Sequence, residues 1–298
     1  MTVALPDAEP RRGRSFRVVS LVFVVLLGIG LAMGFVVYKK YVAYEPRVAA
    51  HVPATASAAL RVDLTHVMFY EPFRRSIFPL ADRFAQGGHS RRERLEEQGI
   101  RVNSDVRELA VLFGPAQADW ALLVGGRLPR GSSASGLAAV LRSEGRAVDQ
   151  EGDLFQLPPS GLAFAEASDG VLVLASSREA LRLALPVGTP DPVLASGAGG
   201  VVIRGGWLPS PLDSLTASFR AGSVVEVSGQ AQSSSDASAG EAVLKALFQQ
   251  LVGNDAPARD AVQRAALSHD SNGIQFRLGL SREAMLGLIE FVGSRAPG

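Results

Sequence analysis

The feature that most constrains this chain is a run of 20 residues, Val18 to Val37, that contains no charged side chain. A helix of this length is about 30 Å long, which matches the hydrocarbon thickness of a lipid bilayer. A helix also satisfies its own backbone hydrogen bonds there, where water is absent. The sequence therefore predicts a transmembrane helix over residues 18–38, with the lipid bilayer as the partner of this segment.

Charges on the two sides of this run predict its orientation. Four arginines precede it and two lysines follow it closely: Arg11, Arg12, Arg14, Arg17, Lys39 and Lys40. By the positive-inside rule, residues 1–17 form a cytoplasmic tail. The bulk of the chain is then periplasmic or extracytoplasmic, on a bacterial inner membrane. A cleaved signal peptide is the alternative, although the run is long and its small-residue site, Gly30-Leu31-Ala32, lies inside it.

Composition excludes several classes of function. The chain has no cysteine, which rules out disulfide scaffolds, thiolate zinc sites and cysteine catalysis. Beyond residue 40 it has 24 basic and 27 acidic residues, a formal charge of −3. No basic surface is left to indicate a nucleic-acid partner.

The exterior part alternates between strand-like and helix-like patterns. We expect a stalk over residues 39–57, a first lobe over 58–188 and a second lobe over 189–298, divided by a Gly/Pro-rich stretch at 186–200. Period-2 alternation and apolar runs predict strands, and apolar residues at helical spacing predict helices. The strands are expected at 59–64, 109–113, 120–125, 162–167, 171–175, 201–204, 224–231 and 274–280, and the main helices at 135–144, 239–252 and 256–267. This pattern predicts an α+β fold, each lobe a mostly antiparallel sheet with helices on one face.

One four-residue motif occurs in both lobes. Ser177-Arg-Glu-Ala180 and Ser281-Arg-Glu-Ala284 each follow a predicted strand and begin a helix with an apolar face. Serine at the cap and glutamate in the first turn are common at helix starts, which is one explanation. The shared context favours the other explanation, an internal duplication.

The N-terminal anchor, the strand VPA…ALRVDL, the segment GIRVNSDVRELAVLFG and the segment DGVLVLASSREAL together resemble a group of bacterial proteins. These are uncharacterised single-pass membrane-anchored proteins with an extracytoplasmic α+β domain of unknown function. The resemblance covers most of residues 50–190. It implies the architecture and transfers no active site.

No catalytic, cofactor-binding or metal-binding residue is predicted. The four histidines stand in no metal-binding pattern: His51, His66, His89 and His269. The hydrolase elbow G-x-S-x-G and the phosphate-binding glycine motifs are absent. No cofactor is expected.

Carboxylates carry no catalytic signature either. Asp63 lies within an apolar strand, so it must face water or pair with a cation such as Arg61 or Arg204. The cluster of Asp149, Glu151 and Asp153 is typical of a surface turn.

The leading interpretation is a non-enzymatic interaction or assembly module of the cell envelope, with an envelope protein as partner. Trp207, Leu208 and Leu212 are the candidate partner-binding residues, because an aromatic residue beside prolines and leucines can form an apolar docking surface. A small-molecule or lipid-binding module with a cavity between the lobes is the alternative. A hydrolase with a dispersed site is a weaker one.

Overall fold

A computed structural model of the chain describes residues 44–67, 91–115, 119–220, 224–252, 256–281 and 283–284. The chain divides into two compact units, Met1–Glu45 and Pro46–Gly298, and all the elements below belong to the second. The predicted transmembrane helix over 18–38 lies outside the described residues. Within the described ranges, no helix is both long and apolar enough to cross a bilayer.

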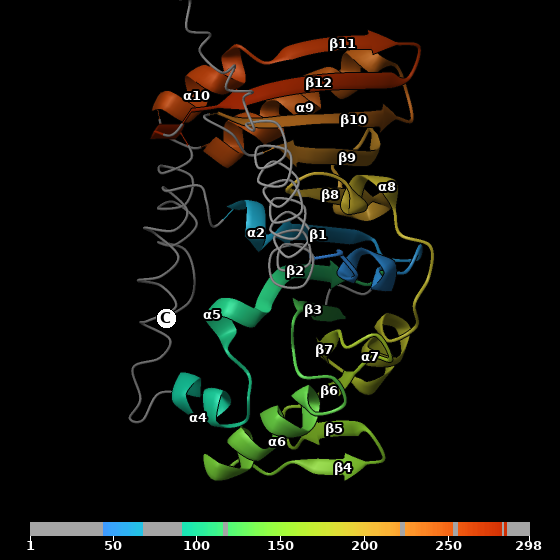
Figure 1. Ribbon diagram of the computed structural model, residues 1–298. Coiled ribbons are helices and arrows are strands. Elements are labelled where there is room, and N and C mark those ends of the chain that lie inside the picture. Colours follow the sequence, from blue (N-terminus) through green and yellow to red (C-terminus); the bar gives the residue numbers. More distant parts are fainter. Residues whose placement is uncertain are drawn as a thin grey trace, which may run out of the picture. The chain divides into compact units, whose positions relative to one another are not determined.

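The second unit is built on one antiparallel sheet of 12 strands (Figure 1). The strand order is β11-β12-β10-β9-β8-β1-β2-β3-β7-β6-β5-β4. The strands are β1 (Ala58–Asp63), β2 (Val106–Phe113), β3 (Trp120–Gly126), β4 (Asp149–Glu151), β5 (Leu154–Leu157), β6 (Leu162–Glu166), β7 (Leu172–Ala175), β8 (Gly199–Arg204), β9 (Leu212–Arg220), β10 (Val225–Ser233), β11 (Ala266–Asp270) and β12 (Gly273–Leu280).

Short and long helices lie on both faces of this sheet. They are η2 (Val48–His51), α2 (Leu64–Val67), α4 (Arg91–Glu97), α5 (Val102–Asp105), α6 (Ser133–Ser143), α7 (Arg178–Ala184), α8 (Pro192–Ala195), η3 (Gly205–Trp207), α9 (Ala237–Val252) and α10 (Ala256–Gln263). Residues paired directly across neighbouring strands share a face. We call the face that carries Ala59 and Leu112 face A, and the face that carries Phe164 and Phe276 face B.

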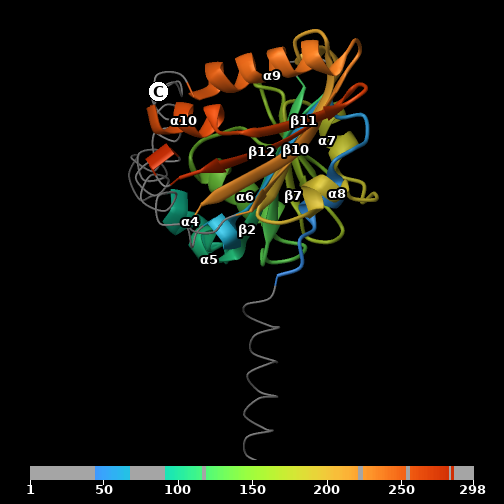
Figure 2. The ribbon, with the colours of Figure 1, turned by 90° about the horizontal axis from the view of Figure 1, so that it is seen from above.

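The sequence predicted helices on one face of each sheet, and this prediction is wrong for the strands β1–β7. Next to β1–β7, η2, α7 and α8 pack on face A, whereas α4 and α6 pack on face B. The reason is that strands such as β6 are buried on both sides, with Ala163, Phe164 and Ala165 all inaccessible. Next to β9–β12, α9 and α10 pack on face B (Figure 2).

The two predicted lobes are halves of one sheet. β1 pairs with β8, from Ala58 opposite Ile203 to Val62 opposite Gly199, and this pairing joins β1–β7 to β8–β12. The expectation of separate lobes is therefore wrong. The halves nevertheless share part of their strand order. In each one, three neighbouring antiparallel strands are followed by helical structure and then by further strands, of which the last pairs with the third; there are four such strands in the first half and two in the second.

The repeated Ser-Arg-Glu-Ala motif occupies the same place in both halves, directly after the last strand. The hydroxyl of Ser177 accepts a hydrogen bond from the backbone N–H of Ala180 at 3.1 Å. The hydroxyl of Ser281 accepts one from the N–H of Ala284 at 3.3 Å. Ser177 is therefore a helix cap, as predicted. Ser281 makes the equivalent hydrogen bond, and most of the helix predicted after it lies outside the described residues.

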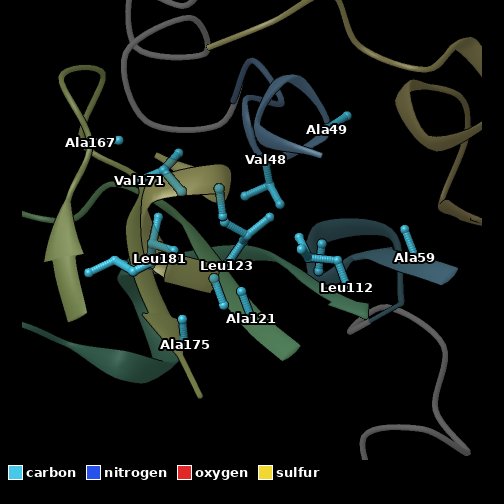
Figure 3. Packing of buried hydrophobic residues seen from close by; sticks show 14 of the residues in the cluster. Val48, Ala49, Ala59, Leu112, Ala121, Leu123, Ala167, Val171, Ala175 and Leu181 are labelled. Carbon is cyan, nitrogen blue, oxygen red and sulfur yellow. The ribbon is translucent and has the colours of Figure 1, made fainter. Parts of the chain in front are cut away.

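The expected stalk over 39–57 is wrong for the part that the structure describes. Val48 and Ala49 of η2 are 0% and 3% exposed, and Val48 points from η2 toward Leu123 on β3 (Figure 3). The approach is so close that a Cβ on Gly125 would lie 2.5 Å from a Val48 methyl group. The segment is thus part of the core, although its prolines and small residues are also typical of a linker.

Candidate functional site

Face A is left uncovered by the described helices across β9, β10, β12 and β11. Its side chains there are polar, in contrast to the apolar side chains that the same strands turn toward α9 and α10. The pairing register aligns them in two rows across the four strands: Ser218, Ser228, Arg277 and Ala266 in the first, and Thr216, Gln230, Gln275 and Ser268 in the second. We call this surface the polar trough.

The polar trough is a hollow with a volume of about 590 Å³, bordered by Val193 of α8. This volume falls within the range of roughly 300–1,000 Å³ that is usual for ligand sites. The side chains of Gln230, Gln275 and Arg277 are exposed and make no hydrogen bond or ion pair with another described residue. Their amide and guanidinium groups can therefore bind a partner without first breaking a contact within the described part of the protein.

The described residues that line the trough are mainly hydrogen-bonding and uncharged. Among the described residues that line it, Arg277 is the one charged side chain, and these residues include no histidine or carboxylate. A guanidinium beside amides and hydroxyls suits a polar partner that carries a carboxylate.

A buried ionic cluster lies on face A at the centre of the sheet. Arg61 and Glu108 are both 0% exposed, and Arg61 Nε donates to Glu108 Oε2 at 2.8 Å. The other carboxylate oxygen of Glu108 accepts the backbone N–H groups of Arg47 at 2.5 Å and Val48 at 2.9 Å. This cluster holds η2 against the sheet, which is a structural role.

The sequence left two alternatives for Asp63, exposure to water or an ion pair, and the structure shows the ion pair. It is 3% exposed, and its Oδ2 lies 3.6 Å from Arg61 Nη2. The predicted ion pair with Arg61 is therefore confirmed. Arg204, the other candidate, pairs instead with Asp191 at 3.2 Å.

His51 is a second buried polar anchor of η2. It is 1% exposed, and its Nε2 lies 3.1 Å from both carboxylate oxygens of Asp169 in the turn between β6 and β7. Its Nδ1 lies 3.2 Å from the carbonyl oxygen of Ala184 at the end of α7. The ring thus joins three segments that are far apart in the sequence.

Of the other three histidines, the structure describes the side chain of His269. His269 lies on β11, and its Nδ1 is 3.1 Å from Glu241 Oε2 on α9. The hydrogen bond from Lys245 to Glu241 holds the pKa of that carboxyl below its ordinary range, and His269 adds to the effect. His89 and the side chain of His66 lie outside the described residues. In the part of the chain that is described, no three histidine or acidic residues are grouped so as to hold a metal ion.

The three predicted partner-binding residues have different surroundings. Leu212 is 3% exposed and belongs to the core beneath α9, so its prediction as a surface residue is wrong. Leu208 is half-buried against the same core. Trp207 is half-buried and packs on Phe113, with ring centroids 5.0 Å apart. A binding role for Trp207 and Leu208 stays a prediction.

Described residues at the junction between the halves line a small hollow. It has a volume of about 130 Å³ and is lined by Ala59 and Val202 of the paired strands, with Asp191 and Arg204 among its other residues. That volume is below the usual range for a ligand site. The strand pairing of β1 with β8 occupies the place where a cavity between lobes was considered.

Comparison with known proteins yields a fold and no family. No protein-family model matches the chain, and no curated protein matches it. The chain is similar to the solved crystal form III of TP0453, with a TM-score of 0.51, 11% identity, and coverage of 84% of this chain and 99% of that one. Crystal form I of TP0453 gives a TM-score of 0.48 at 11% identity and the same coverage. At this identity the likeness shows an α+β fold with a large antiparallel sheet and helices.

Proposed function

We propose that this protein is a non-enzymatic interaction or assembly module of the bacterial cell envelope. In this proposal the polar trough binds an envelope protein that presents a polar, acidic segment. The observation that carries the proposal is the part of face A that no described helix covers, where Gln230, Gln275 and Arg277 border a hollow of about 590 Å³. Matching hydrogen-bonding groups and one carboxylate on the partner would satisfy all three side chains.

The polar character of the partner follows from what the surface offers. The large exposed apolar residues in the described part of the chain are Leu60, Val102, Leu183, Val187 and Val224. They are spread over different elements, and single exposed apolar residues are normal on any protein surface. The surface therefore favours a partner held by hydrogen bonds over one held by an apolar patch.

A binding role also fits the contacts that the buried ionisable groups make inside the fold. The carboxylates of Glu108 and Asp63 and the ring of His51 are held in contacts that fasten η2 and the strand ends. A general acid or base must reach the substrate, whereas these groups are committed inside the fold. This arrangement gives the hydrolase interpretation no support.

The anchor and the location form part of the proposal. The apolar run Val18–Val37 and the arginines before it support a transmembrane helix over 18–38, a cytoplasmic tail over 1–17 and an extracytoplasmic body.

An internal duplication is also part of the proposal. The shared strand order of the two halves and the equivalent caps at Ser177 and Ser281 support a common origin.

Site-specific photocrosslinking in the native envelope tests this function. A photoreactive phenylalanine replaces Gln275 in the full-length chain, and the control carries it at Leu183, which is 60% exposed on α7. We expect one protein to be crosslinked from position 275 and not from position 183. The crosslink should be lost with Arg277→Glu and kept with Arg182→Glu, a matched change of an exposed arginine on α7. If both positions gave the same crosslinked protein, the polar trough would not be the binding site. The same conclusion would follow if Arg277→Glu left the crosslink from position 275 unchanged.

A further inference from the structure

The sheet has two edges, and their chemistry differs. One is β4, which has three residues, Asp149, Gln150 and Glu151, all exposed. The other is β11, which has five residues and pairs with β12 on one side, from Ala266 opposite Arg277 to Asp270 opposite Gly273 (Figure 1). No other described strand pairs with the second side of β11. An edge of this kind presents unpaired N–H and C=O groups to any strand that can align with it.

β4 is protected against pairing with its own copy. If two β4 strands met antiparallel about Gln150, Asp149 of each copy would lie opposite Glu151 of the other. Like charges directly opposite one another are destabilising. Glu151 is also bonded to Arg178, which holds the pKa of Glu151 below its ordinary range and occupies its side chain. A short, charged strand is a usual protection of a sheet edge.

β11 is longer than β4, and Asp270 at its end is its one acidic residue. If two β11 strands met antiparallel about Ser268, the two Ser268 residues would face each other, and Leu267 of each copy would lie opposite His269 of the other. No pair of like charges is brought together. On face B, Leu267 is half-buried and His269 is exposed, so both would lose contact with water on pairing.

We propose that a second copy of this chain binds along β11, antiparallel and centred on Ser268, so that two 12-stranded sheets form one continuous sheet. The fold already contains this type of join, because β1 and β8 pair antiparallel where the two halves meet. A symmetric dimer of this kind uses the same patch on both copies and is closed.

The dimer has a consequence for the polar trough. The two-fold axis of an antiparallel strand pair is perpendicular to the sheet, so face A of both copies lies on the same side. The trough reaches the edge strand, since Ala266 and Ser268 are among its lining residues. The two troughs therefore become neighbours across the axis and form one extended polar surface.

The absence of cysteine makes the pairing directly testable. Ser268→Cys places one thiol per chain at the two-fold axis. Residues directly opposite in an antiparallel pair have Cα atoms about 4.5–5.5 Å apart. A disulfide needs roughly 4.4–6.8 Å, so the two thiols can bond. The matched control is Gln150→Cys, at the centre of the β4 edge and equally exposed.

The experiment uses the full-length chain in its membrane, oxidised with copper phenanthroline and run on a non-reducing gel. We expect a covalent dimer as the main product of Ser268→Cys and a monomer from Gln150→Cys. A Ser268→Cys chain that stays monomeric, although its thiol reacts with a maleimide, would overturn the proposal. Equal dimer from both variants would also overturn it, because it would reflect random collision.

A non-covalent measurement makes the test independent of cysteine chemistry. Ser268→Asp places two carboxylates opposite each other at the axis, whereas Ser268→Asn is similar in size and neutral. In mild detergent, light scattering should give a dimer mass for the wild type and for Ser268→Asn. Ser268→Asp should raise the dissociation constant about tenfold or more, as opposed like charges at an interface do. Identical masses for the two variants at all concentrations would contradict pairing at β11.

Discussion

The buried pair of Arg61 and Glu108 allows the sharpest test of how the fold is held together. Both side chains are 0% exposed and 2.8 Å apart, and Glu108 also receives the backbone N–H groups of Arg47 and Val48. Arg61→Met leaves the Glu108 carboxylate buried without its cation. Glu108→Gln keeps an acceptor for the N–H groups and leaves the Arg61 guanidinium without its main partner.

The expected losses follow from the cost of an uncompensated buried charge. Breaking a buried pair from one side costs about 3–5 kcal/mol of unfolding free energy. In a unit of this size 1 kcal/mol corresponds to about 2–4 °C, so each single variant should lower the Tm by about 6–20 °C. The double variant Arg61→Met with Glu108→Gln removes both charges together. Its loss should be smaller than the sum of the two single losses by at least about 2 kcal/mol.

Urea unfolding of the full chain in mild detergent, followed by circular dichroism, measures these energies. Glu97→Gln, a change of an exposed glutamate on α4, is the control and should stay within about 0.5 kcal/mol of the wild type. If the two single losses simply add in the double variant, the charges act independently. The ionic cluster would then not be what fastens η2 to the sheet.

Three further predictions concern local contacts. Gly126→Ala should prevent folding or lower the Tm sharply, because the new Cβ would lie 1.8 Å from the carbonyl oxygen of Asp105. Gly206→Ala is the control and should be tolerated, since its Cβ would meet nothing within 4 Å. His51→Ala should speed limited proteolysis before residue 57 at a dose that leaves the wild type intact, since η2 loses both of its ring contacts. The lowered pKa of Glu241 means that its contribution to stability is present at neutral pH and is lost as pH falls through that pKa. A carboxyl NMR titration should show the midpoint rise in Lys245→Met.

Much of the sheet could be predicted from alternation alone. The pattern Ile274-Gln-Phe276-Arg-Leu278 predicted β12 to within one residue, because one face of this strand is buried and the other is exposed to solvent. The cap at Ser177 was predicted by local chemistry that does not depend on distant residues. These features are local, so the sequence contains them directly.

Other elements were missed because their environment is set by the rest of the fold. Residues 256–267 were predicted as one helix, but α10 ends at Gln263 and Ala266 begins the edge strand β11. β9 was not predicted, since its stretch Leu212–Arg220 mixes small, polar and apolar residues without a clear period. The polar trough depends on four strands, β9, β10, β12 and β11, becoming neighbours. The sequence alone shows the alternating polar residues of β12. The strand order, which the sequence does not show, brings β9 and β10 beside that strand.

The pairing of β1 with β8 has a consequence for biosynthesis. β1 acquires its first partner as soon as β2 emerges, but its other edge has to wait until β8 has been made. During that interval the nascent chain exposes a strand with the apolar residues Ala59, Leu60 and Val62, which other chains could capture. A chaperone that shields this strand would therefore matter most while the ribosome is translating the segment between Asp63 and Gly199.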